Sequence, residues 1–221
     1  MSELYDDKYQ LYRNYYNKYI IKMIPRFSKV LDVGCSGGQL GRVLKNESGC
    51  SVYGIDISQE AIAEAKKYLI NAVVMDIESH GLPFIDERFD IIILGDVLEH
   101  LKVPANVLLK LKLLLNPTGR MIVSLPNVAN VTIRLNLLLG RWNYKPSGIL
   151  DETHLRFFTL KTMKQLFQSC ELKIEQVDST PGFDFFIAKY FRFLKPVTNA
   201  LCKCFPTLFS NQFIFLLSPR T

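Results

Sequence analysis

Short apolar stretches, each ending in a polar turn, recur through the first half of the chain. Their composition is typical of strands that are buried on both faces, as in a parallel sheet. Between them lie two stretches with helical periodicity, roughly 59–68 and 104–115, the second with Pro104 at a helix-start position. The expected strands are residues 30–33, 52–56, 71–76, 89–96 and 119–126. This alternation predicts an α/β fold with a doubly wound parallel sheet.

The second half of the chain departs from this regular alternation. A long connection, residues 127–158, follows the fifth expected strand, and connections of this length in compact domains are usually functional. A helix is expected at 160–170, with Thr159 as its N-cap residue. Two further strands are expected at 172–178 and 212–218, which would complete a sheet of seven strands.

Tyrosines recur with helical spacing near the N-terminus, which predicts a helix over residues 3–24. One interpretation is a helix that packs on the domain, with each ring buried and each hydroxyl at the wet edge. The other is a lid over a ligand. The residues on this stripe are Tyr5, Tyr9, Tyr12, Tyr16, Tyr19 and Met23.

The chain carries a formal net charge of +6, and its isoelectric point is near 9.0. The positive residues recur in two places, and neither place resembles a known nucleic-acid-binding module, which disfavours nucleic acid as a partner. These residues are Arg134, Arg141, Lys145 and Arg156 in the long connection, and Lys189, Arg192, Lys195 and Lys203 further along the chain.

Cysteine usage and the apolar runs bear on location. Five cysteines, an odd number without framework spacing, indicate reduced thiols and a cytoplasmic protein. Cys202-Lys203-Cys204 lacks the spacing of a zinc site, and no metal site is expected. The N-terminus has no signal-peptide pattern, and no apolar run reaches the ~18 residues that a membrane span needs.

A glycine-rich turn after the first expected strand is the most informative motif. Asp32 precedes Gly34-Cys35-Ser36-Gly37-Gly38, and the next expected strand ends in Asp56. Such a βαβ unit binds a nucleoside, because the turn exposes its backbone and the second acid accepts hydrogen bonds from ribose hydroxyls. The dinucleotide fingerprint fails, since Ser36 and Gln39 occupy two of its glycine positions. No lysine follows as in a phosphate-binding P-loop.

The turn resembles the first motif of class I S-adenosylmethionine (SAM)-dependent methyltransferases, which Asp32, Gly34 and Gly38 match. Ser36 stands where that family usually has its middle glycine. The later acids at strand ends follow in the family's order. The resemblance implies one Rossmann-like domain over residues 1–221 with sheet order 3-2-1-4-5-7-6, the seventh strand being antiparallel. It also implies an N-terminal helical lid (1–26) and insertions after strands five (127–158) and six (184–209).

The resemblance further implies SAM as the cofactor and S-adenosylhomocysteine as its product. Asp32 would reach the methionine ammonium, Asp56 the ribose hydroxyls and Asp76 the adenine amino group; Asp32 and Asp76 also fit plain helix-capping and turn roles. Gly95 and Asp96 would border the methionine portion and the acceptor. The expected cofactor-binding residues are Asp32, Gly34, Cys35, Gly38, Asp56, Ile57, Asp76, Ile77, Gly95 and Asp96.

Two histidines are candidates for the catalytic base, because an imidazole titrates near neutral pH. His154 lies in the acceptor-side connection beside Asp151 and Glu152, which are expected to raise its basicity. His100 follows the fourth strand and is either an acceptor-facing base or a surface residue. Asp96 and Glu99 fit a capping box for the intervening turn. His80 lies in a Ser-His-Gly loop, where solvent exposure is expected.

The acceptor is predicted less sharply than the cofactor. The connection resembles a bacterial methyltransferase subfamily linked with surface-polysaccharide and sugar modification and, more loosely, the ubiquinone-biosynthesis O-methyltransferases. Methyl transfer to a hydroxyl of a small molecule or glycan intermediate is therefore expected, ahead of an amine or carboxylate. The alternatives are a quinone or lipid O-methyltransferase and a non-catalytic binding subunit. Arg134, Arg141 and Arg156 suit an anionic acceptor, or else surface salt bridges to Asp151 and Glu152.

Residues 184–205 carry basic positions on one side and apolar, often aromatic, positions on the others. This pattern is typical of a helix that lies in a membrane interface, which would place the protein peripherally at the inner membrane face. A packed insertion and a dimer interface are the alternatives, and the oligomeric state stays open. Pro196 is expected to bend or break this helix.

Overall fold

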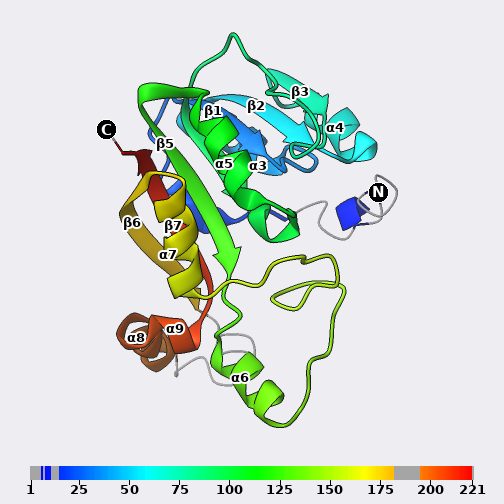
Figure 1. The fold of residues 1–221 in the computed structure, drawn as a ribbon. Helices are drawn as coiled ribbons and strands as arrows, with labels where there is room; N and C mark the ends of the chain where they lie inside the picture. The colour runs from blue at the N-terminus through cyan, green and yellow to red at the C-terminus, as the bar shows by residue number, and fades with distance from the viewer. Residues whose placement is uncertain (1–5, 7, 11–14, 182–194, 221) are drawn as a thin grey trace.

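A seven-stranded sheet forms the centre of the computed structural model, which describes residues 6, 8–10, 15–181 and 195–220 (Figure 1). Its strand order is β3-β2-β1-β4-β5-β7-β6, as predicted. β7 runs antiparallel to β5 and β6, whereas the other neighbouring strands are parallel. The strands are β1 (Lys29–Val33), β2 (Ser51–Asp56), β3 (Asn71–Val74), β4 (Phe89–Gly95), β5 (Leu115–Pro126), β6 (Leu172–Pro181) and β7 (Ser210–Pro219).

Helices begin where the local sequence offers a start signal. Thr159 forms a capping box with Thr162 at the start of one helix, as its N-cap assignment predicted, and Pro104 occupies the first turn of another. The helices are α2 (Lys18–Ile21), α3 (Gln39–Ser48), α4 (Gln59–Ala65), η1 (Leu98–His100), α5 (Pro104–Lys112), α6 (Val131–Leu138), α7 (Leu160–Ser169), α8 (Lys195–Cys204) and α9 (Pro206–Phe209).

Two hydrophobic cores lie on opposite faces of the sheet. The alternation along β4 shows the division, because Ile91 and Ile93 join one core and Ile92 and Leu94 join the other. Buried side chains of α2, α3 and α4 fill the first core, and those of α5 and α7 fill the second. Because helices cover both faces of the sheet, the central strands are continuous apolar runs in the sequence.

The N-terminal helix predicted over residues 3–24 is wrong as a continuous element. Residues 15–17 are not helical, and the side chain of Asn17 accepts a hydrogen bond from the backbone N–H of Tyr19, which starts the short helix α2. Tyr9 is 6% exposed and Tyr16 37% exposed, so these two rings do not share one environment. Tyr5 and Tyr12 lie outside the described residues.

The basic amphipathic segment predicted over 184–205 lies largely outside the described residues. Its described part begins with α8, where Pro196 occupies the first turn, a position that a helix tolerates. No helix in the described parts of the chain is long and apolar enough to cross a membrane. No disulfide joins the cysteines within these ranges.

Candidate active site

A cavity of about 1370 Å³ opens at the carboxyl ends of the central strands. Its walls come from the N-terminal segment, the glycine-rich turn, the ends of β2 and β4, and the connection after β5. Ligands of open α/β sheets bind at this edge. Eleven predicted site residues line the cavity: Asp32, Gly34, Cys35, Asp56, Ile57, Asp76, Ile77, Gly95, Asp96, His100 and His154.

The glycine-rich turn is held in an unusual backbone conformation. Gly34 has a φ of 73° and Ser36 a φ of 48°, both in the left-handed region that disfavours side chains. The sequence resemblance expects a glycine at the position of Ser36, and this positive φ is one that glycine adopts without strain. Here the Ser36 N–H donates to Oδ2 of Asp56 at 2.8 Å, which stabilises the strained turn.

Gly38 serves packing rather than the cavity surface, and Cys35 both lines the cavity and packs behind the turn. Gly38 has a φ of 76°, and a Cβ there would lie 3.0 Å from Cα of Ala65, so this glycine lets α3 approach α4. Gly38 is not among the cavity-lining residues. Cys35 packs against Gly54, where an added Cβ would lie 2.6 Å from its Sγ. Burial raises the pKa of this thiol, which is therefore unreactive at neutral pH.

Two acids at adjacent strand ends give the cavity a negative wall. Asp32 is 4% exposed, and burial together with the nearby Asp56 raises its pKa to about 7. Burial also raises the pKa of Asp56, although its Oδ1 accepts a hydrogen bond from the Ser58 N–H at 2.9 Å. Acids with raised pKa values favour a cationic ligand, because a positive charge would stabilise their ionised forms. The ammonium and sulfonium groups of SAM fit this requirement.

Asp76 has both of the roles that the sequence left open. It lines the cavity, and its carboxylate also accepts hydrogen bonds from the Glu78 N–H at 2.9 Å and the Ser79 hydroxyl at 2.6 Å. Burial acts to raise the pKa of Asp76, but these hydrogen bonds outweigh it and lower the pKa. The turn thus holds this carboxylate ionised beside the cavity.

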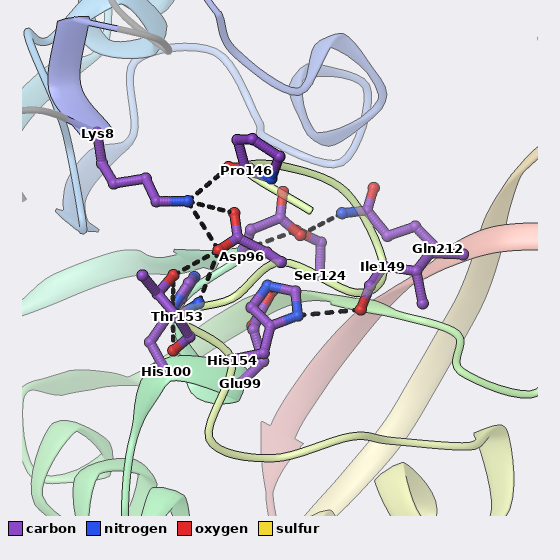
Figure 2. A network of polar contacts seen from close by, with 11 residues as sticks. Lys8, Asp96, Glu99, His100, Ser124, Pro146, Ile149, Thr153, His154 and Gln212 are labelled. Carbon is purple, nitrogen blue, oxygen red and sulfur yellow. Dashed lines mark hydrogen bonds and ion pairs between the residues drawn. The ribbon is translucent and has the colours of Figure 1, made fainter. Parts of the chain in front are cut away.

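Asp96 does not cap the following turn, so the capping box predicted for Asp96 and Glu99 is wrong. Val97 is the N-cap residue of η1, and Asp96 itself has a φ of 57°. Its carboxylate instead accepts hydrogen bonds from Gln212 on β7 and, at 3.4 Å, from the Ser124 hydroxyl (Figure 2). Burial raises its pKa to about 6 despite these two donors. Strained residues of this kind concentrate at functional sites.

Glu99 is a site residue that the sequence assigned to helix capping. Its side chain is 1% exposed, and neither carboxylate oxygen has a hydrogen-bond partner among the described residues. Burial raises the pKa of Glu99 well above its usual value, and Asp96 adds to the effect. Its backbone carbonyl accepts hydrogen bonds from the N–H groups of Leu155 and Arg156 at 2.8 and 3.0 Å, which join the long connection to η1.

The two candidate histidines meet beside Glu99 (Figure 2). The ring centroids of His100 and His154 lie 4.8 Å apart, and Nε2 of His154 is 3.9 Å from Oε1 of Glu99. Asp151 acts to raise the pKa of His154, as expected, but burial outweighs this effect and the pKa is lowered. Burial also lowers the pKa of His100, to about 4. Both rings are neutral at physiological pH. His80, as expected, is exposed.

Lys8 pairs with Asp151 and adds a small lowering of the pKa of His154 to the larger effect of burial. Its Nζ lies 2.8 and 2.9 Å from the two carboxylate oxygens of Asp151, whose side chain is 4% exposed (Figure 2). A second contact joins Asp6 to the hydroxyl of Ser58 beside the cofactor end. The N-terminal segment therefore contacts both ends of the cavity, the arrangement that a lid requires.

The three arginines considered for an anionic acceptor do not line the cavity. Arg134 donates to the backbone carbonyl of Ala129 at 2.6 Å, and Arg156 donates to that of Lys102 at 2.6 Å. In the described part of the chain, the cation that pairs with Asp151 is Lys8. These contacts give no support to an anion site built from the arginines.

Comparison with known proteins agrees with this geometry. A protein family described as a methyltransferase domain matches residues 8–177. The chain belongs to this family. S-adenosylmethionine is accordingly the cofactor of its methyltransferase domain, in agreement with the two acids at the carboxyl ends of β1 and β2.

Named relatives of this methyltransferase domain differ in how much they share with it. The ubiquinone biosynthesis O-methyltransferase of Coxiella burnetii (strain RSA 331) is 32% identical over 167 residues, covering 71% of this chain and 69% of that protein. The bifunctional methionine biosynthesis protein MetXA/MetW of Rhodopirellula baltica is 28% identical over 171 residues. The match covers 71% of this chain but only 27% of the bifunctional protein.

A solved structure shares the fold at low sequence identity. It is that of a TehB-like SAM-dependent methyltransferase from Corynebacterium glutamicum, with a TM-score of 0.61 and 18% identity. The alignment covers 99% of this chain and 98% of the other. The shared architecture therefore extends beyond the glycine-rich turn to the whole sheet.

SAM affinity of this methyltransferase domain is expected to fall as pH drops below about 7. Asp32 has a pKa near 7 in the ligand-free protein, and a cation binds best to its ionised form, so acidification must weaken binding by up to about tenfold per pH unit. Calorimetric titration of SAM across this range measures the effect. An Asp32→Asn variant should bind SAM more weakly, and its affinity should depend less on pH. A wild-type SAM affinity that does not change with pH would contradict the role of Asp32 in binding the cation.

Proposed function

We propose that the protein transfers the methyl group of SAM to a hydroxyl oxygen of a small molecule or glycan intermediate. The observation that carries the proposal is one continuous cavity with two chemically different ends. Asp32 and Asp56 make the cofactor end negative, and the neutral imidazoles of His100 and His154 lie at the other end.

At the cofactor end, the chain's own residues bind and orient. When bound, SAM supplies a methyl group on a positively charged sulfur and leaves as neutral S-adenosylhomocysteine. Asp56 would accept hydrogen bonds from the ribose, because its carboxylate lies at the carboxyl end of β2 and is oriented by the Ser36 and Ser58 N–H groups. Asp32 would pair with the ammonium, and Ile57 and Ile77 would pack on the adenine.

At the acceptor end, a hydroxyl must lose its proton as its oxygen bonds to the methyl carbon. A neutral imidazole has a lone pair for this task, whereas an imidazolium has none. The lowered pKa values of both histidines keep them neutral and therefore competent at physiological pH. The electron pair of the broken carbon–sulfur bond stays on sulfur, so charge and atoms balance across the transfer. The ion pair between Lys8 and Asp151 would hold the N-terminal segment over the cavity and exclude water from it.

Methyl transfer from labelled SAM to a matched set of hydroxyl, amine and carboxylate acceptors tests the proposal. S-adenosylhomocysteine formation that requires a hydroxyl acceptor is the expected result. Turnover restricted to amines or carboxylates would contradict the acceptor class. SAM binding without turnover on a broad acceptor set would favour the non-catalytic alternative.

A second candidate, methylation of a quinone or another lipid at a membrane surface, is favoured by helix α6. This helix projects from the connection after β5 (Figure 1), and Leu135, Leu137, Leu138 and Leu139 are between 56 and 82% exposed. Arg134 and Arg141, both exposed, flank these leucines. Apolar side chains bordered by arginines suit the boundary between lipid headgroups and acyl chains. The names of the ubiquinone O-methyltransferase relatives agree with such an acceptor.

Replacing Leu138 and Leu139 by aspartate is expected to abolish co-sedimentation with anionic liposomes. Each leucine removed from the interface loses about 1.5–3 kcal/mol of burial, and the aspartates add repulsion from anionic lipid. The matched control is Leu113→Asp, because Leu113 is also exposed but lies at the end of α5. No liposome binding by the wild-type protein, or equal loss in the control, would contradict membrane contact through α6.

A further inference from the structure

One cluster of side chains has a feature that methyl transfer alone does not require, a buried carboxylate between two imidazoles. The cluster consists of Glu99, His100 and His154. One potential ligand atom from each residue lies within 4.8 Å of the other two. Glu99 contributes a carboxylate that is buried and lacks a hydrogen-bond partner in the described part of the chain. Burying a carboxylate is costly unless it is paired or bound to a metal. We infer that Glu99, His100 and His154 bind one divalent transition-metal cation.

The orientation of both imidazoles supports this assignment. Nδ1 of His154 lies 3.1 Å from the carbonyl oxygen of Ile149, and Nδ1 of His100 lies 3.2 Å from that of Thr153. A carbonyl only accepts, so Nδ1 carries the hydrogen in each ring and Nε2 carries the lone pair. Metal-binding histidines usually donate their second ring N–H to a carbonyl or carboxylate in this way.

The donor set indicates the class of metal. Two imidazole nitrogens and one carboxylate oxygen suit Zn²⁺ and other first-row divalent cations, whereas Mg²⁺ and Ca²⁺ prefer oxygen alone. Three protein ligands also leave a coordination position open, as in catalytic rather than structural zinc sites. Asp96 and Asp151 add negative charge that acts on Glu99, and Lys8 offsets part of it by pairing with Asp151.

The metal site deepens the proposed function, on which its catalytic role rests. With a cation bound, the Nε2 lone pairs of His100 and His154 would hold the metal, and the cation would replace the imidazoles as the group that activates the hydroxyl. An acceptor hydroxyl in the open position would bind the cation through oxygen, and the cation would lower the pKa of that hydroxyl. The hydroxyl proton would then leave to water, and the oxygen would keep the electron pair that forms the bond to the methyl carbon. The same cluster borders the cavity that also receives SAM, so metal and methyl donor would act on one acceptor.

Direct metal binding by the full chain tests the inference without relying on turnover. Chelator-treated protein is titrated with Zn²⁺ by calorimetry and with Co²⁺ by visible absorption, and Mg²⁺ serves as the comparison ion. One equivalent of Zn²⁺ or Co²⁺ is expected, with much weaker Mg²⁺ binding. Glu99→Gln and His154→Ala should each weaken Zn²⁺ binding by more than about tenfold, since losing even an outer partner of a ligand costs about 10- to 100-fold. His80→Ala, which changes the exposed histidine, should bind like the wild type.

Thermal unfolding separates a ligand role from a merely structural one. Without metal, Glu99→Gln is expected to leave the melting temperature near the wild-type value, because the amide has nearly the same shape as the buried carboxyl group that it replaces. Zn²⁺ should then stabilise the wild type but not this variant. Absent Zn²⁺ and Co²⁺ binding in the wild type, or unchanged binding in Glu99→Gln, would overturn the inference. SAM titration of the same chelated protein tests the cofactor separately. Intact metal binding with no hydroxyl methylation would overturn the proposed function alone.

Discussion

Replacing His154 by alanine is expected to lower kcat by about two to four orders of magnitude, the usual contribution of proton transfer at a reacting hydroxyl. Its ring is held by the carbonyl of Ile149 and lies against His100 and Glu99, so no other part of the described chain supplies the same nitrogen at this place. SAM affinity should stay near the wild-type value, because these contacts do not involve the glycine-rich turn. Single-turnover kinetics and SAM titration measure the two quantities separately.

His80→Ala is the matched control for His154→Ala, since His80 is exposed in a loop. It should keep wild-type turnover. Near-full activity of the His154→Ala, His100→Ala and double variants would contradict activation by this cluster, and the acceptor would then be an amine or carboxylate that is already deprotonated. If His154→Ala loses both activity and Zn²⁺ binding, the cation is the activating group. If Zn²⁺ binding survives, direct proton removal by the imidazole accounts for the loss.

Asp56→Ala is expected to weaken SAM binding by about 1–3 kcal/mol, roughly 5- to 150-fold, the cost of losing hydrogen bonds to a charged group. The variant loses the predicted ribose contacts. It also loses the acceptor for the Ser36 N–H, and with it the support of a turn whose φ of 48° is strained. Calorimetric titration of SAM gives the affinity, and near-ultraviolet circular dichroism shows whether the turn's surroundings remain native.

Asp86→Ala, an exposed acid-to-alanine change outside the cavity, should leave SAM affinity unchanged. Asp56→Asn separates charge from geometry, because its amide oxygen still accepts one backbone N–H. An affinity loss in Asp56→Ala with full recovery in Asp56→Asn would assign the effect to the turn. Unchanged affinity in both variants would contradict the role of Asp56 at the cofactor.

The sheet could be predicted from sequence because its central strands must be apolar on both faces. In β4, consecutive isoleucines pack into two different cores, and this requirement produces an uninterrupted apolar run in the sequence. The cofactor end could be predicted for a similar reason. Its acids follow strands directly, and parallel strands bring their carboxyl ends together, as Asp32 and Asp56 show.

The acceptor end could not be predicted in the same way, because it depends on contacts between distant segments. Glu99 has the spacing of a capping residue, and its burial arises only when the connection folds back to place Leu155 and Arg156 on its carbonyl. Lys8 gave no local signal of its pairing with Asp151, and the burial that lowers the pKa of His154 arises only in the folded chain. The broken N-terminal helix was closer to predictable, since Asn17 is a good N-cap residue.

The position of β7 has a consequence for how the protein is made. This strand follows all the others in the sequence, yet it lies inside the sheet, between β5 and β6. During synthesis, β5 therefore has an unpaired edge until residues 210–219 leave the ribosome. Until then β6 also lacks the neighbouring strand with which it pairs. Gln212, which donates to Asp96, arrives with that strand. The nascent chain should thus acquire its nucleoside-binding half first, and the polar contacts around Asp96 only when β7 closes the gap.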